Sequence, residues 1–256
     1  MSRKKGRELR RRSELLWGDG ARASRGPKPG LTREDIVRAA IRIADRDGLA
    51  ALTRQAVAKK LGFTTMALYR YFPSKEALVD AIVDAAMGRP PRGAEPNADR
   101  RGQLERWAHA KRAMLTARPW LAELPFFAAA HGPNWLSWVD AAVEALSRTG
   151  LSAADMFEMV TVIVGYVREA SNTAVSRARA RAGGTSDEEW GAAIAADLGR
   201  AVGDPRFPAL SAVLTSGSGG PARTLEECFD FGLQRVLDGI QVYVDSRPAY
   251  REAGGG

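Results

Sequence analysis

Apolar residues recur every three or four positions through most of the chain, the spacing that gives an α-helix one apolar face. In the N-terminal third, this pattern predicts a group of short helices, at 32–47, 53–61, 64–72 and 74–87. Further on, it predicts helices at 99–117, 134–147, 152–182, around Trp190 and at 224–245. Residues 203–222, rich in Gly, Pro and Ser, are expected to form a loop. We therefore expect an all-α fold.

Capping residues support the predicted boundaries of the short helices. Thr53, either Thr64 or Thr65, and Ser74 stand where a hydroxyl can accept a hydrogen bond from an unpaired backbone N–H. Gly62 lies between two of these helices, where the C-cap needs a left-handed conformation. Two short helices joined by a tight glycine turn are the layout of a helix-turn-helix, whose second helix enters the major groove of DNA.

The segment from Leu31 to Met87 resembles the N-terminal domain of the tetracycline-repressor (TetR) family of transcription regulators. The matching residues are a looser form of the run A-x-x-A-x-x-x-L-G between Ala40 and Gly48, then Thr53, Val57-Ala58, Leu61-Gly62 and above all the string Leu68-Tyr69-x-Tyr71-Phe72-x-x-Lys75. The resemblance implies a three-helix DNA-binding domain at 31–87. It also implies a larger helical-bundle domain at 88–256 that dimerises and binds a ligand.

The resemblance and the helix geometry together predict which side chains contact DNA. Arg54 can reach a phosphate or a base edge, Met66 or Ala67 can touch a thymine methyl, and the tyrosine hydroxyls can donate to phosphates. The ammonium group of Lys75 can pair with a phosphate at the start of the next helix. The full set of expected DNA-binding residues is Thr53, Arg54, Thr64, Thr65, Met66, Ala67, Tyr69, Tyr71 and Lys75.

The positive charge of the chain is concentrated at its N-terminus. Residues 1–30 hold ten Lys/Arg and three Asp/Glu, residues 31–90 hold ten and seven, and the remainder holds eighteen and twenty. A basic front fits a protein whose N-terminal part meets a polyanion. We expect 1–30 to be a basic, partly disordered arm with a short helix at 8–17, which either contacts DNA or is a solvated tail. Trp17 would dock this arm onto the body.

Aromatic and methionine side chains gather in the helices of the central region. The helix expected at 99–117 carries Leu104, Trp107, Ala108, Lys111 and Leu115 at helical spacing. Such stripes are more often core than pocket, but the resemblance implies an effector pocket among these helices, and such pockets are largely apolar. The expected ligand-binding residues are Trp107, Met114, Phe127, Trp135, Trp138, Met159, Ile163 and Tyr166. Candidate polar groups are His109, His131, Asn134, Glu158, Tyr166 and Asn172.

Other classes of function find little support in the sequence. We find no catalytic set, no phosphate-binding glycine loop and no metal-ligand cluster, so we expect no enzyme activity, no cofactor and no metal. The single cysteine, Cys228, excludes an internal disulfide framework. The chain has neither a signal peptide nor a run of about 20 apolar residues, so we expect a cytoplasmic protein, associated with the nucleoid when it binds DNA.

The sequence therefore predicts a homodimeric, sequence-specific repressor. Its expected partners are a second copy of itself, a double-stranded and palindromic operator, and a small apolar or amphipathic effector that releases it from the operator. An activator, or a regulator without a small-molecule ligand, stays open as an alternative. A DNA-packaging protein that ignores sequence is a further alternative, although it would not need an aromatic-rich second domain.

Overall fold

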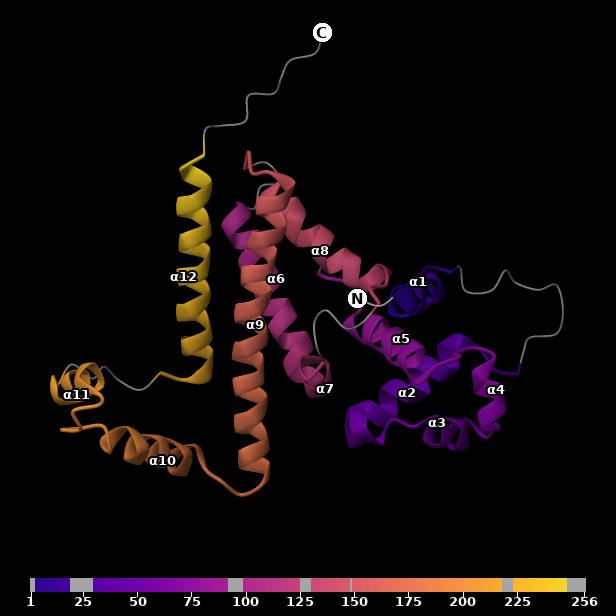
Figure 1. The fold of residues 1–256 in the computed structure, drawn as a ribbon, viewed down its shortest axis with the longest axis horizontal. Helices are drawn as coiled ribbons and strands as arrows, with labels where there is room; N and C mark the ends of the chain where they lie inside the picture. The colour runs from indigo at the N-terminus through magenta and orange to yellow at the C-terminus, as the bar shows by residue number, and fades with distance from the viewer. Residues whose placement is uncertain are drawn as a thin grey trace, which may run out of the picture.

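A computed structural model describes residues 3–18, 30–91, 99–124, 130–147, 149–217 and 223–247. Within these ranges all regular elements are helical, as expected (Figure 1). The α-helices are α1 (Arg3–Trp17), α2 (Arg33–Asp47), α3 (Arg54–Leu61), α4 (Thr65–Tyr69), α5 (Lys75–Met87), α6 (Arg100–Ala117), α7 (Pro119–Ala122), α8 (Pro133–Leu146), α9 (Ala153–Ala182), α10 (Asp187–Gly199), α11 (Pro208–Thr215) and α12 (Leu225–Asp245). A short 3-10 turn, Leu49–Ala51, follows α2.

Helices α2 to α5 form a small unit whose boundaries follow local capping chemistry. Thr32 and Asp35 form a reciprocal capping box at the start of α2. The hydroxyls of Thr53, Thr64 and Ser74 cap α3, α4 and α5, so Thr64 rather than Thr65 is the cap of α4. Gly62 ends α3 with φ 73° and ψ 25°, a left-handed cap that a side chain would strain. These caps confirm the predicted starts of the three helices and the end of α3, whereas α4 ends at Tyr69 rather than at Phe72 as predicted.

The expected N-terminal helix is longer than its apolar pattern indicated, because it begins at Arg3 rather than near Glu8. It packs against α5 (Figure 1). Arg12 makes a two-pronged ion pair with Asp80 of α5, with Nε–Oδ2 and Nη2–Oδ1 distances of 2.6 Å. The indole of Trp17 donates to the carbonyl of His131 at 3.0 Å, so Trp17 docks this helix as expected. Residues 19–29 of the arm lie outside the described residues.

The second part of the molecule is a bundle in which α6, α8 and α12 pack around the long helix α9 (Figure 1). Its core includes fully buried Ile163 of α9 and Leu233 of α12. The two helices approach closely at Gly232, where an added Cβ would lie 2.2 Å from the hydroxyl of Tyr166. That hydroxyl donates to the carbonyl of Phe229 at 2.8 Å, so α9 and α12 are fastened at this point. No described helix is long and apolar enough to cross a membrane.

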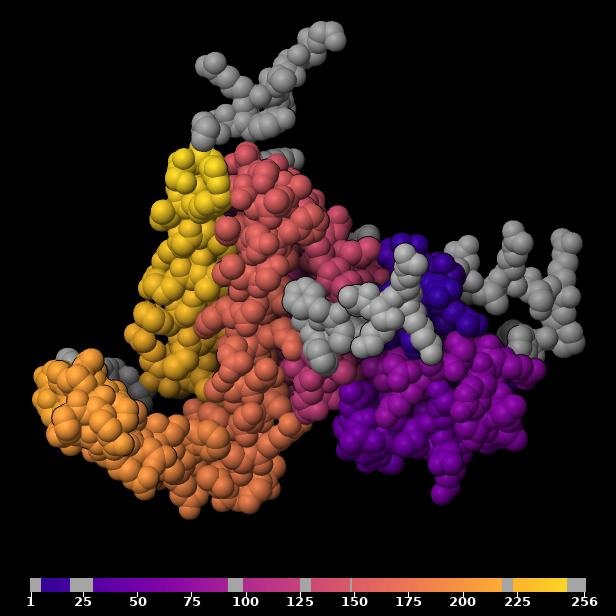
Figure 2. Space-filling model, viewed as in Figure 1, coloured from indigo at the N-terminus to yellow at the C-terminus, as the bar shows by residue number. Residues whose placement is uncertain are grey.

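Helices α10 and α11 extend away from the bundle at the far end of α9 (Figures 1 and 2). The prediction of a loop over 203–222 was wrong in part, because Pro208 to Thr215 form α11. Pro208 occupies the first helical position, where its fixed φ is favourable, and a run of helix-compatible residues follows it. Large apolar side chains of both helices are exposed, among them those of Trp190, Ile194 and Val213, and Phe207 directly before α11 is exposed too.

Candidate DNA-binding surface and ligand cavity

The side chains expected to contact DNA lie on the outer surface of α3, α4 and the start of α5. Met66, in the first turn of α4, is 74% exposed, and Tyr69 is 43% exposed. Thr53 and Thr64 are exposed, while Thr65 and Ala67 are half-buried. The capping threonines use a hydroxyl oxygen as acceptor, so the hydroxyl hydrogen stays available for a phosphate oxygen.

Arg54 and Tyr69 form a joined pair on this surface. Nη1 of Arg54 donates to the phenolic oxygen of Tyr69 at 2.6 Å, and the guanidinium carbon lies 4.3 Å from the centre of the Tyr69 ring. The Tyr69 hydroxyl therefore accepts from Arg54 and can still donate its own hydrogen outward. The pair presents one positive charge and one donor at a fixed position, which suits a phosphate group.

Lys75 and Tyr71 differ in their orientation. Lys75 is exposed and is the first residue of α5, where the helix dipole disfavours a positive charge and favours an anion. Tyr71 is half-buried, and its hydroxyl donates inward to the carbonyl of Leu31 at 2.7 Å. This bond does not fit the expectation that Tyr71 donates to a phosphate, because a phenol has a single hydrogen to donate. We therefore leave Tyr71 out of the DNA surface.

A cavity of about 60 Å³ lies where five helices meet, at the junction between α5 and the bundle. Its apolar wall includes Val83 and Met87 of α5, and Met114 and Leu115 of α6. Trp135 of α8 and Val164 of α9 complete this wall, together with Leu121, Leu124 and Ala130. The polar groups that face the cavity are Asp84, Lys111, His131 and Arg168.

Lys111 is buried although it carries an amino group. Its side chain is 6% exposed, and Nζ lies 4.8 Å from the ring centre of Trp138 and 5.9 Å from that of Trp107. Burial, with a smaller contribution from the charge of Arg168, lowers the pKa of Lys111 to about 7. Near neutral pH, this amine is therefore poised between its charged and neutral forms.

Asp84 acts as a cap for a helix other than its own. The residue that begins α8 is Gly132, which has no side chain to cap it. Instead, Oδ1 of Asp84 accepts from the N–H of Trp135 at 2.9 Å, and Oδ2 accepts from that of Asn134 at 3.3 Å. A Cβ on residue 132 would lie 2.4 Å from the Asp84 carboxyl carbon, so only glycine fits here. Burial raises the pKa of Asp84, and the N–H groups oppose that rise.

The cavity contains two of the eight residues expected to bind a ligand, Met114 and Trp135. Trp107 and Trp138 are buried behind it and flank Lys111, with the Trp107 indole donating to the Trp138 carbonyl at 2.9 Å. Three others lie outside it: Ile163 belongs to the core, Met159 is half-buried against that core, and Tyr166 fastens α12. Phe127 lies outside the described residues. Of the candidate polar groups, His131 lines the cavity and stacks on Trp135 with 3.8 Å between ring centres.

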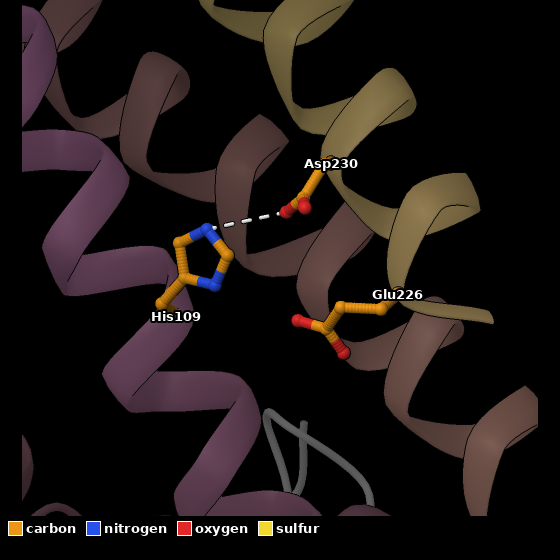
Figure 3. A group of neighbouring side chains, drawn as sticks. All are labelled: His109, Glu226 and Asp230. Carbon is orange, nitrogen blue, oxygen red and sulfur yellow. Dashed lines mark ion pairs between the residues drawn. The ribbon is translucent and has the colours of Figure 1, made fainter. Parts of the chain in front are cut away.

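A second group of polar side chains joins α6 to α12 (Figure 3). Nε2 of His109 lies 3.3 Å from Oδ1 of Asp230, and Glu226 stands one turn away on α12. The ligand atoms of these three residues lie within 4.8 Å of one another, a spacing that a divalent cation could bridge. However, the guanidinium of Arg112 already pairs with Glu226, which disfavours a second cation. We interpret the group as an ion-pair cluster that holds α12 against α6. Sequence reasoning missed this cluster, because His109 is more than 100 residues away from Glu226 and Asp230 in the chain.

Comparisons with known proteins agree on one family. A profile described as "Bacterial regulatory proteins, tetR family" matches residues 36–82. A second, "Tetracyclin repressor-like, C-terminal domain", matches 92–244. The transcriptional repressor DrrR1 of Streptomyces coeruleorubidus is 35% identical over 247 residues, which cover 94% of this chain and 88% of that protein.

Solved structures show the same arrangement of helices. BioQ of Mycobacterium smegmatis has a TM-score of 0.61 at 26% identity, covering 83% of this chain and 99% of that one. A structure of BioQ with its double-stranded DNA operator has a TM-score of 0.58 at 23% identity, covering 85% and 99%. The Streptomyces coelicolor protein ActR, in complex with actinorhodin, has a TM-score of 0.67 at 21% identity, covering 85% and 98%.

Proposed function

This chain belongs to the TetR family of transcription regulators, and we propose that it is a homodimeric repressor released from its operator by a small apolar or amphipathic effector. The chain is a DNA-binding regulator rather than an enzyme. The single observation that carries the proposal is the position of α5. Its first turn borders the DNA surface at Lys75, and its last turn forms a wall of the cavity at Val83, Asp84 and Met87.

For the DNA contacts, we propose that α4 lies in the major groove with Met66 at the bases. Its 74% exposure supports this role, since an apolar side chain so exposed gains from contact with a thymine methyl. Arg54, Tyr69 and Lys75 would hold the phosphates, and Thr53, Thr64, Thr65 and Ala67 would complete the surface. With few long polar side chains at the bases, the shape of the DNA would supply part of the specificity.

The dimer would form through α9 and α12. Both helices keep large apolar side chains on the outside of the bundle, with Phe157 55%, Val162 51%, Phe231 46% and Val242 70% exposed. A patch of this kind commonly marks an interface. Two recognition helices related by a two-fold axis would match half-sites about 34–36 Å apart on a palindromic operator. Cys228, exposed on α12, would lie near this interface.

We divide the chain according to these roles. Residues 31–87 would be the DNA-binding domain, 88–256 the effector and dimerisation domain, and 1–30 a basic arm. The two family profiles, which end at 82 and begin at 92, support a division between them. A protein with this function would work in the cytoplasm, on the nucleoid.

Fluorescence anisotropy with full-length protein tests the proposal. The probe is the DNA upstream of the protein's own gene, with a scrambled duplex of equal length as competitor. A preference of about a thousandfold or more is expected for a specific regulator. Equal affinity for both duplexes, followed by failure of a random-sequence selection to enrich any site, would contradict the proposal.

A further inference from the structure

Lys111 is the one buried lysine among the described residues, and the fold gives its charge no partner. Lysine is almost never fully buried unless it is paired. Among the described residues, no carboxylate lies within ion-pair distance of Nζ, and no hydrogen bond from Nζ is present. The Trp107 and Trp138 rings that it faces supply a cation–π attraction, which offsets only part of the free energy that burial of the charge costs.

The side chains around Lys111 make the cavity electrostatically positive. Arg168 lines the same cavity, and its Nη2 donates to the carbonyls of Ala122 and Leu124 at 3.1 and 2.9 Å. The carboxylate of Asp84, also at the cavity, is held by the N–H groups that begin α8. Two cations therefore face a space whose described carboxylate is already bonded elsewhere.

We propose that the effector is an apolar acid, with a carboxylate, sulfonate or acidic phenol on a largely hydrocarbon body, and that Lys111 receives the acidic group. This inference rests on the proposed function, in which the cavity is the effector site. An anion would provide the partner that Lys111 lacks. A neutral ligand of the same shape would only remove the remaining water from the amine.

The rest of the cavity defines the body of the ligand. Its other lining is largely apolar, from Val83 and Met87 on one side to Leu121 and Val164 on another. A small acid such as acetate would gain little there, because most of the binding energy in such a site comes from apolar contact. A volume of about 60 Å³ holds no aromatic ligand unless the walls move, so binding would displace the helices that line the cavity.

Two probes with one skeleton test the inference on the full-length protein. 1-Anilinonaphthalene-8-sulfonate is an anion, and N-phenyl-1-naphthylamine lacks only the sulfonate; both become fluorescent in apolar surroundings. At pH 6, the anion is expected to bind the native protein more tightly than the neutral probe does. Lys111→Met is expected to weaken anion binding by about thirtyfold or more, the factor for removing one member of a buried charge pair, and to leave binding of the neutral probe unchanged or tighter.

Arg106→Met is the matched control, since Arg106 is an exposed cation on the same helix. It is expected to leave both affinities unchanged. Equal loss of anion binding in both variants would show a general charge effect and would overturn the inference. So would unchanged anion binding in Lys111→Met, or failure of both probes to bind the native protein.

The DNA anisotropy assay separates this inference from the proposed function. If the native protein prefers its upstream DNA, and only the neutral probe releases it, then the proposed function is supported and the proposal of an acidic effector is wrong. If the protein shows no preference for any DNA, the proposed function fails, whatever the probes do. Release by the anion, lost in Lys111→Met and kept in Arg106→Met, would support both.

Discussion

Lys111→Met should stabilise the protein, by an amount that depends on pH. Burial lowers the pKa of Lys111 from 10.5 to about 7, so the folded protein resists a proton that the unfolded chain accepts. The folded-state pKa lies below the unfolded value. The stability cost is therefore complete below pH 7 and shrinks as the pH rises toward 10.5. Methionine has a similar length and no charge, so it removes the cost.

The magnitude follows from the two pKa values. At about 1.4 kcal/mol per pKa unit, the fall from 10.5 to about 7 corresponds to about 5 kcal/mol at pH 6. At pH 9 the cost depends only on the difference between the pH and the unfolded-state pKa of 10.5, which corresponds to about 2 kcal/mol. The gain in the free energy of unfolding from Lys111→Met should therefore fall by roughly half or more between these two pH values.

Urea unfolding at pH 6 and pH 9, followed by circular dichroism, measures this difference. Protein concentration must be held constant, because dissociation of a dimer contributes to the unfolding free energy. Asp84, His131 and Arg168 also face the cavity, but they are present in both proteins. Arg106→Met should give no gain at either pH. A Lys111→Met variant that is less stable than the native protein at pH 6, or whose gain does not change with pH, would refute the reasoning.

Three further predictions concern the arm, the DNA surface and the bundle. Arg12→Met should lower the free energy of unfolding by about 3 to 5 kcal/mol, because it leaves the carboxylate of Asp80 buried without its cation. Arg11→Met, at an exposed position, should change the free energy of unfolding by less than about 0.5 kcal/mol, and urea unfolding compares the two variants. Tyr69→Phe and Lys75→Ala should each weaken binding to every duplex by about fivefold, as measured by anisotropy. Tyr71→Phe should leave the affinity for DNA unchanged, because the Tyr71 hydroxyl bonds the carbonyl of Leu31. An equal loss of affinity from both tyrosine changes would contradict this surface. Gly232→Ala should lower the free energy of unfolding by about 1 to 3 kcal/mol, because the new methyl group forces Tyr166 away from α12. Gly239→Ala on the same helix meets no atom within 4 Å and should be neutral or stabilising. A Gly232→Ala variant that unfolds at a higher temperature than Gly239→Ala would refute the close approach.

The helix caps of the helix-turn-helix could be predicted from the sequence because their signals are local. Caps, the left-handed glycine and the spacing of apolar residues all act within one or two helical turns, and the structure confirms Thr53, Gly62 and Ser74 in these roles. The orientation of Tyr71 could not be predicted in this way. Its hydroxyl donates to a carbonyl 40 residues away. The sequence alone does not show which side of a short helix packs against the rest of the fold.

The cavity could be predicted only in part, because its lining side chains come from five helices and are spread over residues 83–168. Periodicity identified the apolar stripe of α6, and Lys111 lay on it between Ala108 and Leu115. A lysine on an apolar stripe is a signal that could have indicated the cavity. The role of Asp84 had no such signal, since it depends on Gly132, whose missing side chain leaves room for a carboxylate from another helix.

Helix α5 explains how a ligand in so small a cavity could affect DNA binding. Asp80 and Asp84, one turn apart, hold α5 to α1 and to the start of α8. These bonds limit the directions in which α5 can tilt. Its thirteen residues span about 20 Å, at about 1.5 Å per residue. A tilt of roughly 10° at the Met87 end would move the Lys75 end by about 3 Å, enough to break a hydrogen bond to a phosphate. An acid that binds the tilted state more tightly than the DNA-bound one would therefore release the operator, by as much as that difference in affinity allows.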